Sequence, residues 1–211
     1  MLVKKGAEAN LYLEEWHNRK VIMKRRLPKK YRIRQLDKEI RSQRTVHEPH
    51  IIHKAKEAGV PTPTIFMVDV AEANIIMEFV DGKQVKQVLN DLSPEERLRL
   101  SRHIGELIGR LHKHAIIHGD LTTSNMILTS HGKVVFVDFG LSERSMELET
   151  RGVDLHLMKR AFQSTHYKYA RGCFEAVMEG YANVVGEDEA KNVLEKIREI
   201  IRRGRYVSRA R

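Results

Sequence analysis

Two short segments of this 211-residue chain hold the residues best suited to catalysis. The first reads His118-Gly119-Asp120-Leu121-Thr122-Thr123-Ser124-Asn125, and the second is Asp138-Phe139-Gly140. Phosphoryl transfer needs a carboxylate that orients the attacking hydroxyl and accepts its proton, together with oxygen ligands that hold Mg²⁺ against a triphosphate. The two segments supply these groups in order, and they predict a phosphoryl-transfer site that uses ATP and Mg²⁺.

The spacing of these groups is typical of a protein-kinase catalytic loop. There, an Asp is followed after four residues by a metal-binding Asn, and a D-F-G turn follows a short hairpin. Asp120 and Asn125 have this separation, and residues 126–137 contain two short apolar runs around a Gly-containing turn. We therefore expect Asp120 to be the catalytic residue and Asn125 and Asp138 to be the metal ligands. A capping Asp and a turn Asp beside an ordinary hairpin are the alternative, but the motifs would then coincide by chance.

A phosphate-binding Lys is predicted on a strand near the N-terminus. Val21-Ile22-Met23-Lys24 matches the strand that carries this Lys in kinases, so Lys24 is expected to bind ATP and to serve catalysis. A helix Glu should hold the Lys. Glu39 and Glu48 both follow on the next predicted helix, and we favour Glu48, although Pro49 beside it is expected to disturb that helix.

The loop that covers the phosphates departs from the usual G-x-G-x-x-G pattern. Only Gly6-Ala7-Glu8-Ala9-Asn10 precedes the first predicted strand, and Glu8 adds a negative charge there. Gly6 is the expected contact to the nucleotide. Affinity should then depend more on Lys24, on Mg²⁺ and on the hinge, where Glu78 and Val80 are expected to offer backbone groups to adenine.

Two further departures concern regulation. Gly119 stands where typical protein kinases carry an Arg that binds an activation-loop phosphate. The segment after Gly140 is short and lacks an A-P-E motif. We therefore expect neither activation by loop phosphorylation nor a broad platform for an extended peptide.

The predicted fold class is α+β, a reduced bilobal protein-kinase-like fold. Strands at 11–13, 21–23, 65–68 and 75–77 are crossed by one helix at 36–58, which predicts an N-terminal lobe over residues 1–79. A capping box at Ser93 begins a further helix, and the segments 153–162, 167–184 and 187–203 predict three more, the last ending at Gly204. The helical lobe is expected over residues 80–197, followed by a basic tail over 198–211.

The charge of the chain, +10 with a pI near 9.7, is concentrated in two clusters. One covers residues 24–34 and the other lies within the expected tail, which predicts a polyanionic partner unless these are simply solvated faces. No apolar run could span a bilayer and no signal segment is evident, so we expect a cytoplasmic protein without membrane contact.

Across its whole length the chain resembles the small atypical kinase subunit of the KEOPS complex, in its archaeal stand-alone form. The segments that carry the resemblance are Gly6-Ala7-Glu8-Ala9, residues 24–32, Arg44-Thr45 before Glu48, the H-G-D and D-F-G segments, Val153-Asp154-Leu155, Arg160-Ala161-Phe162, Ser164-Thr165-His166 and Arg203-Gly204-Arg205. Pro49 is a departure from that family's pattern.

The resemblance implies a serine/threonine kinase and ATPase that works beside a threonylcarbamoyl-transferase subunit and other KEOPS subunits in modifying tRNA. It implies the same roles for Asp120, Asn125, Asp138 and Lys24, and tRNA or partner binding by the basic tail. Two other functions stay open at this point. One is a small-molecule kinase of the aminoglycoside or choline type, and the other is a non-catalytic scaffold that binds tRNA.

Overall fold

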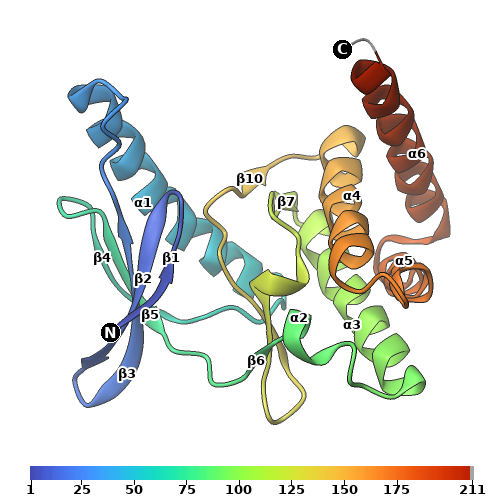
Figure 1. The fold of residues 1–211 in the computed structure, drawn as a ribbon, viewed down its shortest axis with the longest axis horizontal. Helices are drawn as coiled ribbons and strands as arrows, with labels where there is room; N and C mark the ends of the chain where they lie inside the picture. Colours follow the sequence, from blue (N-terminus) through green and yellow to red (C-terminus); the bar gives the residue numbers. More distant parts are fainter. Residues whose placement is uncertain (210–211) are drawn as a thin grey trace.

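The N-terminal part of the computed structural model, which describes residues 1–209 and the side chains of residues 1–203, is built on an antiparallel sheet (Figure 1). Its five strands lie in the order β1-β2-β3-β5-β4. Their bounds are β1 Leu2–Lys5, β2 Ala9–Trp16, β3 Arg19–Arg26, β4 Ile65–Asp69 and β5 Asn74–Glu78. The four predicted strands are present. β1 was not predicted because this edge strand is exposed along its whole length and has no alternation of apolar residues.

A single long helix, α1 (Arg34–Glu57), accompanies this sheet, as predicted. The expectation that Pro49 disturbs the helix is wrong, because α1 continues through it. Proline leaves the carbonyl of Thr45 without its helical N–H donor, but burial of Ile51 and Ile52 on the same helix favours continuation. One residue earlier, the Arg44 carbonyl accepts a hydrogen bond from the Arg26 guanidinium at 3.2 Å.

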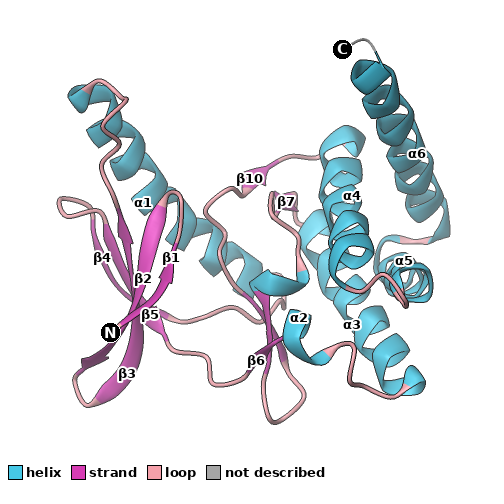
Figure 2. Ribbon diagram, viewed as in Figure 1, coloured by secondary structure: helices cyan, strands magenta, loops and turns pink. Residues whose placement is uncertain are grey.

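The rest of the chain is mainly helical, and the ribbon coloured by secondary structure shows small strands confined to its side facing the sheet (Figure 2). In chain order the elements are β6 Lys83–Gln84, α2 Val85–Val88, α3 Pro94–Lys113, β7 Ile116–Ile117, the 3-10 turn η1 Thr123–Asn125, β8 Met126–Leu128, β9 Val134–Phe136, β10 Glu143–Arg144, α4 Leu148–Thr165, α5 Ala170–Val185 and α6 Glu187–Arg209. This is the α+β, bilobal architecture that the sequence predicts.

Helix α3 forms the centre of the helical part. It begins at the predicted capping box, in which Ser93 and Glu96 exchange side-chain to backbone hydrogen bonds of 3.0 and 3.3 Å. Helix α5 crosses it closely at Gly105 and Gly180, because a Cβ atom at either position would overlap a backbone carbonyl of the other helix. The close crossing fixes the end of α3 and therefore the loop that follows it.

The C-terminal region differs from the prediction. Helix α6 continues through Gly204 to Arg209, so Gly204 does not end it and residues 198–209 belong to the helix. Its first turn carries three acidic residues, which favours helix formation there. The side chains of Arg205 and Arg209, and all of Arg211, lie outside the described residues. None of the described helices is both long and apolar enough to span a membrane.

Candidate active site

The loop between β7 and β8 brings Asp120 and Asn125 into contact. The Asn125 amide donates to the Asp120 carboxylate at 2.8 Å and to the Asp120 carbonyl at 3.0 Å. The 3-10 turn η1 closes the loop so that the two side chains face each other. Because the side-chain amide nitrogen of Asn125 donates within the loop, the side-chain oxygen Oδ1 of Asn125 is the atom left to act as a metal ligand.

The buried carboxylate of Asp154 on α4 holds this loop by hydrogen bonds to its backbone. Asp154 accepts backbone N–H bonds from His118 and Gly119, both at 2.9 Å, and its side chain is fully buried. It also contacts the His112 ring at 3.2 Å, and the other nitrogen of that ring lies 3.1 Å from the Tyr181 hydroxyl. Sequence reasoning assigned no role to this network, although the position of Asp154 in a short family motif was a usable signal.

The predicted hairpin is present and positions Asp138. Strands β8 and β9 pair in antiparallel register, with Met126 opposite Phe136. The Val137 N–H donates to the backbone carbonyl of Asn125 at 2.9 Å. Asp138 itself has a left-handed backbone (φ +65°), which is uncommon for a residue other than glycine. The turn places the Asp138 carboxylate on the same side of the hairpin as the catalytic loop.

Lys24 on β3 links α1 to the D-F-G segment. Its ammonium lies 2.7 Å from the Glu48 carboxylate and 2.6 Å from the Asp138 carboxylate. Of the two predicted partners, the structure therefore pairs Lys24 with Glu48 and not with Glu39. Glu48 is 1% exposed and the Lys24 side chain 7%.

The ionisation of this trio follows from its contacts. Burial alone would lower the pKa of Lys24, but the carboxylates of Glu48 and Asp138 raise it above the ordinary 10.5. For the Asp138 carboxyl, burial acts to raise the pKa, whereas the neighbouring Lys24 ammonium holds it below the ordinary 3.8. Both groups are consequently charged at neutral pH.

The backbone of Gly119 has no room for a side chain. Its φ is +78°, and a Cβ atom there would overlap the Leu141 carbonyl oxygen and lie 2.8 Å from the carbonyl carbon. The segment after the D-F-G thus packs directly on the catalytic loop, where typical kinases have an Arg. His47 on α1 contacts the same segment, with its ring nitrogen 3.0 Å from the Ser142 carbonyl.

The phosphate-covering loop joins β1 and β2. Gly6 starts the turn, where its N–H donates to the Ala9 carbonyl at 3.0 Å. The negative charge of Glu8 is compensated, because its carboxylate pairs with Arg44 on α1 and lies 3.6 Å from Arg32. The expected repulsion between this loop and phosphate groups is therefore reduced.

A cavity of about 250 Å³ brings most of these groups together. The predicted site residues on its wall are Gly6, Lys24, Asp120 and Asp138. Asn125 contacts Asp120 and Glu48 contacts Lys24, so both adjoin it. Arg26, Arg44 and Lys4 also line the cavity, and none of them was predicted as a site residue.

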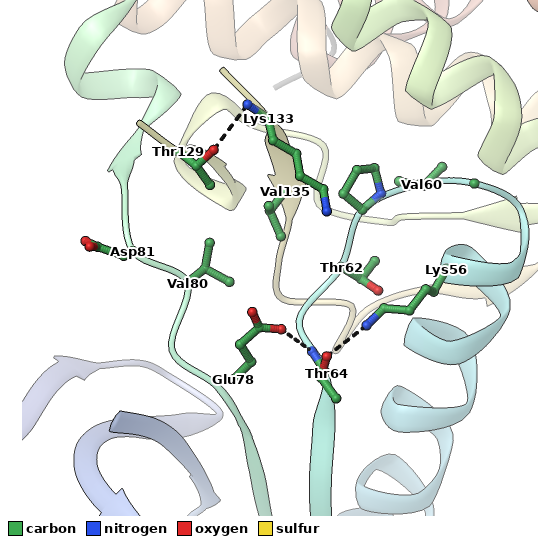
Figure 3. Close-up of a pocket in the computed structure, with 12 residues that line it drawn as sticks. Lys56, Val60, Thr62, Thr64, Glu78, Val80, Asp81, Thr129, Lys133 and Val135 are labelled. Atoms are coloured by element: carbon green, nitrogen blue, oxygen red, sulfur yellow. Dashed lines mark hydrogen bonds between the residues drawn. The ribbon is translucent and has the colours of Figure 1, made fainter. Parts of the chain in front are cut away.

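The two predicted hinge residues, Glu78 and Val80, do not line the cavity that contains Lys24. Glu78 and Val80 line a separate cavity of about 540 Å³, and Figure 3 shows the Glu78 carboxylate directed at the Thr64 backbone N–H, 2.9 Å away. Lys56 reaches the Thr64 hydroxyl from the other side at 3.1 Å. The Glu78 N–H is also engaged, with the Thr64 carbonyl at 2.8 Å.

The donor set fits Mg²⁺. Oxygen atoms of Asp138 and Asn125 are hard ligands of the kind that Mg²⁺ prefers. Among the described residues no group of three His, Cys, Asp or Glu side chains could hold a metal by itself. This is compatible with Mg²⁺, which is commonly held by one or two carboxylates together with substrate phosphates.

Comparisons with known proteins agree with this geometry. Residues 6–168 match the family model of the protein kinase domain. The chain is 49% identical to the KEOPS complex subunit Bud32 of Pyrococcus abyssi, over 99% of this chain and 97% of that protein. It is 46% identical to the probable bifunctional tRNA threonylcarbamoyladenosine biosynthesis protein of Methanothermobacter thermautotrophicus, over 97% of this chain but 36% of that longer protein.

A solved structure shows the same fold. The Rio2 kinase of Chaetomium thermophilum, in a complex with ADP/Mg²⁺ and phosphoaspartate, superposes with a TM-score of 0.65 at 17% identity, over 93% of this chain and 69% of that one. At this identity the likeness concerns the fold alone. The kinase-domain match and the nearly end-to-end match to the Pyrococcus protein show that the chain belongs to the protein kinase family, in the group of KEOPS complex kinase subunits.

Proposed function

We propose that this kinase-family enzyme is an ATP-dependent serine/threonine kinase and ATPase. The observation that carries the proposal is that Lys24 from the N-terminal sheet lines one cavity with Asp120 and Asp138, which come from two motifs in the helical part. Lys24 is charged and buried there, held by Glu48 at 2.7 Å. A site of this kind catalyses chiefly by positioning and by stabilising charge on the transferred group.

Each residue has a role in this proposal. Lys24 binds the α- and β-phosphates, and Glu48 keeps it in place. Asn125 and Asp138 would hold Mg²⁺, which neutralises charge that develops on the phosphate oxygens. Asp120 orients the attacking hydroxyl or water and accepts its proton, and Asn125 fixes that carboxylate through the 2.8 Å bond.

The loop and the hinge would complete nucleotide binding. Gly6 would let the backbone approach the phosphates. The backbone of Val80 and the carbonyl of Glu78, whose N–H is already bonded to Thr64, would bind adenine. Compensation of Glu8 by Arg44 and Arg32 supports this use of the loop, because it leaves less unpaired negative charge beside the triphosphate.

We further propose that the protein acts as a subunit of the KEOPS complex, beside a threonylcarbamoyl-transferase subunit, in threonylcarbamoyladenosine modification of tRNA. The support is the names of its relatives, one a KEOPS subunit of almost equal length and others bifunctional proteins of which this chain spans about a third. A cytoplasmic location is part of the same proposal. The basic residues from Arg198 onward, which are helical through Arg209, would contact tRNA.

Replacement of Asp138 by Ala tests the catalytic proposal. ATP turnover, followed as released phosphate and as radiolabel on protein with the partner subunit and tRNA present, should fall on the order of 100-fold or more. Asp91→Ala, at an exposed loop position, is the matched control and should retain turnover. Equal turnover in wild type and Asp138→Ala would refute the proposal, and Mg²⁺-ATP that fails to raise the melting temperature of the wild type would favour a non-catalytic scaffold.

A further inference from the structure

The buried Glu48 carboxylate is held by two cations. Lys24 contacts one of its oxygens at 2.7 Å, and Arg26 contacts the other at 2.5 Å. Lys24 and Arg26 are two positions apart on β3, so their side chains lie on the same face of the strand. The Arg26 side chain is 3% exposed, and the intervening Arg25 points to solvent.

During nucleotide binding Lys24 would face four acceptors, Glu48, Asp138 and oxygens of the α- and β-phosphates, with only three N–H donors on its ammonium. It already divides its contacts between Glu48 and Asp138, and in the proposed function it must also reach phosphate oxygens. When one ammonium is shared in this way, Glu48 keeps only part of its compensation. A buried carboxylate without a full partner is strongly unfavourable, so Glu48 needs a second cation that does not leave.

Arg26 meets this requirement because it takes no part in the contact between Lys24 and Asp138. The same guanidinium nitrogen that contacts Glu48 also donates to the Arg44 carbonyl on α1 at 3.2 Å. This contact lies next to the Thr45 carbonyl, which Pro49 leaves without its helical N–H donor. Arg26 therefore ties β3 to α1 at the turn of the helix where the backbone ladder is interrupted.

Resting on the proposed function, we propose that Arg26 is a positioning residue that holds the Glu48 carboxylate and α1 in place while Lys24 turns to the nucleotide. In this arrangement the position of α1 depends on Arg26 and not on a phosphorylated activation segment. Arg26 itself need not touch the nucleotide. The Lys24–Glu48 pair would then be able to bind nucleotide in the isolated chain.

Three variants isolate this role. Arg26→Met removes the guanidinium but keeps an unbranched apolar side chain, and Arg26→Lys restores the charge without the planar guanidinium. Arg25→Met is the matched control, since Arg25 is the neighbour on the same strand, is 49% exposed and, among the described residues, forms an ion pair only with Glu72, at 3.8 Å. Calorimetric titration with Mg²⁺ and a non-hydrolysable ATP analogue measures affinity apart from turnover.

We expect Arg26→Met to raise the dissociation constant of the analogue by on the order of 10-fold to 100-fold, the scale set by one charge-assisted hydrogen bond. Arg26→Lys should recover most of this loss, and Arg25→Met should bind as the wild type. Unchanged affinity with a lower fraction of binding-competent protein in Arg26→Met would overturn the proposal, because it would show a contribution to folding alone.

A double-mutant cycle gives the decisive readout. In a Glu48→Gln background there is no buried charge for Arg26 to compensate, so Arg26→Met should change affinity less than about 2-fold. Independent, multiplying effects of the two substitutions would overturn the positioning role. Failure of the proposed function is distinguishable, since the wild type would then not bind the analogue at all.

Discussion

Replacement of Gly119 by Ala tests whether the segment after the D-F-G packs directly on the catalytic loop. Two separate effects should follow. A side chain at φ +78° costs about 1–2 kcal/mol of left-handed backbone strain. The new Cβ would also overlap the Leu141 carbonyl, and overpacking of this kind costs about 1–3 kcal/mol. The free energy of unfolding should therefore fall by about 2–5 kcal/mol.

Gly132 provides the matched control. Its φ is +76°, almost the same as that of Gly119, but no atom of the described residues lies within 4 Å of a Cβ atom placed there. Gly132→Ala should thus lose only the strain of about 1–2 kcal/mol. Urea unfolding of both variants measures the difference, and ATP turnover should fall in Gly119→Ala alone because Leu141 and the adjoining D-F-G must shift. Equal losses of stability, with turnover retained in Gly119→Ala, would refute direct packing of Leu141 on this loop.

Three further outcomes are expected. Asp154→Asn should lower the free energy of unfolding by about 2–5 kcal/mol and reduce turnover, since an amide nitrogen would face the backbone N–H groups of His118 and Gly119. The exposed loop variant Asp91→Asn is the control in urea unfolding. An unaltered Asp154→Asn would contradict the role of this carboxylate. The stability difference between the wild type and Asp138→Asn should shrink as pH falls below about 4. A carboxyl whose folded-state pKa is depressed stabilises the fold above its unfolded pKa and loses this effect as pH falls through the folded pKa. Denaturation from pH 6 to 3 measures this difference, and a difference that grows in acid would be inconsistent with the Lys24 contact. The double variant Arg198→Gln/Arg202→Gln on α6 should weaken tRNA binding. It should also reduce the slope of log affinity against log salt by about 0.7–0.9 for each phosphate that is no longer neutralised. The control Arg171→Gln on α5 should change neither quantity, and an unchanged slope in the double variant would exclude α6 from tRNA binding.

The sequence predicts the parts of this molecule whose signals are local. The D-F-G hairpin, the capping box at Ser93 and the apolar stripe of α3 each declare themselves within about twenty residues through motif, cap or period. Strand context predicts Lys24 and the spacing to Asn125 predicts Asp120, and the structure brings both residues to one cavity. For these elements the structure adds distances and little else.

Features that depend on partners distant in the sequence could not be predicted in this way. The persistence of α1 through Pro49 rests on burial of Ile51 and Ile52, so helix propensity alone gives the wrong answer. Likewise Arg26 is, by sequence, one basic residue among several in a run. Only the register of β3 turns its side chain inward, towards Glu48. β1 was missed for the opposite reason, because an exposed edge strand buries nothing that would mark it.

Three contacts, made by α1, the segment after the D-F-G and the catalytic loop, bear on how the activity of the site is regulated. In kinases that are switched by phosphorylation, new ion pairs order the activation segment and bring the helix Glu to the Lys. Here Glu48 is already beside Lys24, His47 already contacts the Ser142 carbonyl, and Gly119 already receives the Leu141 backbone. The Lys24–Glu48 pair is buried, and each of the other two contacts involves a backbone carbonyl. These contacts therefore favour the hypothesis that activity is controlled by access of the nucleotide or the acceptor to the cavity, through a binding partner.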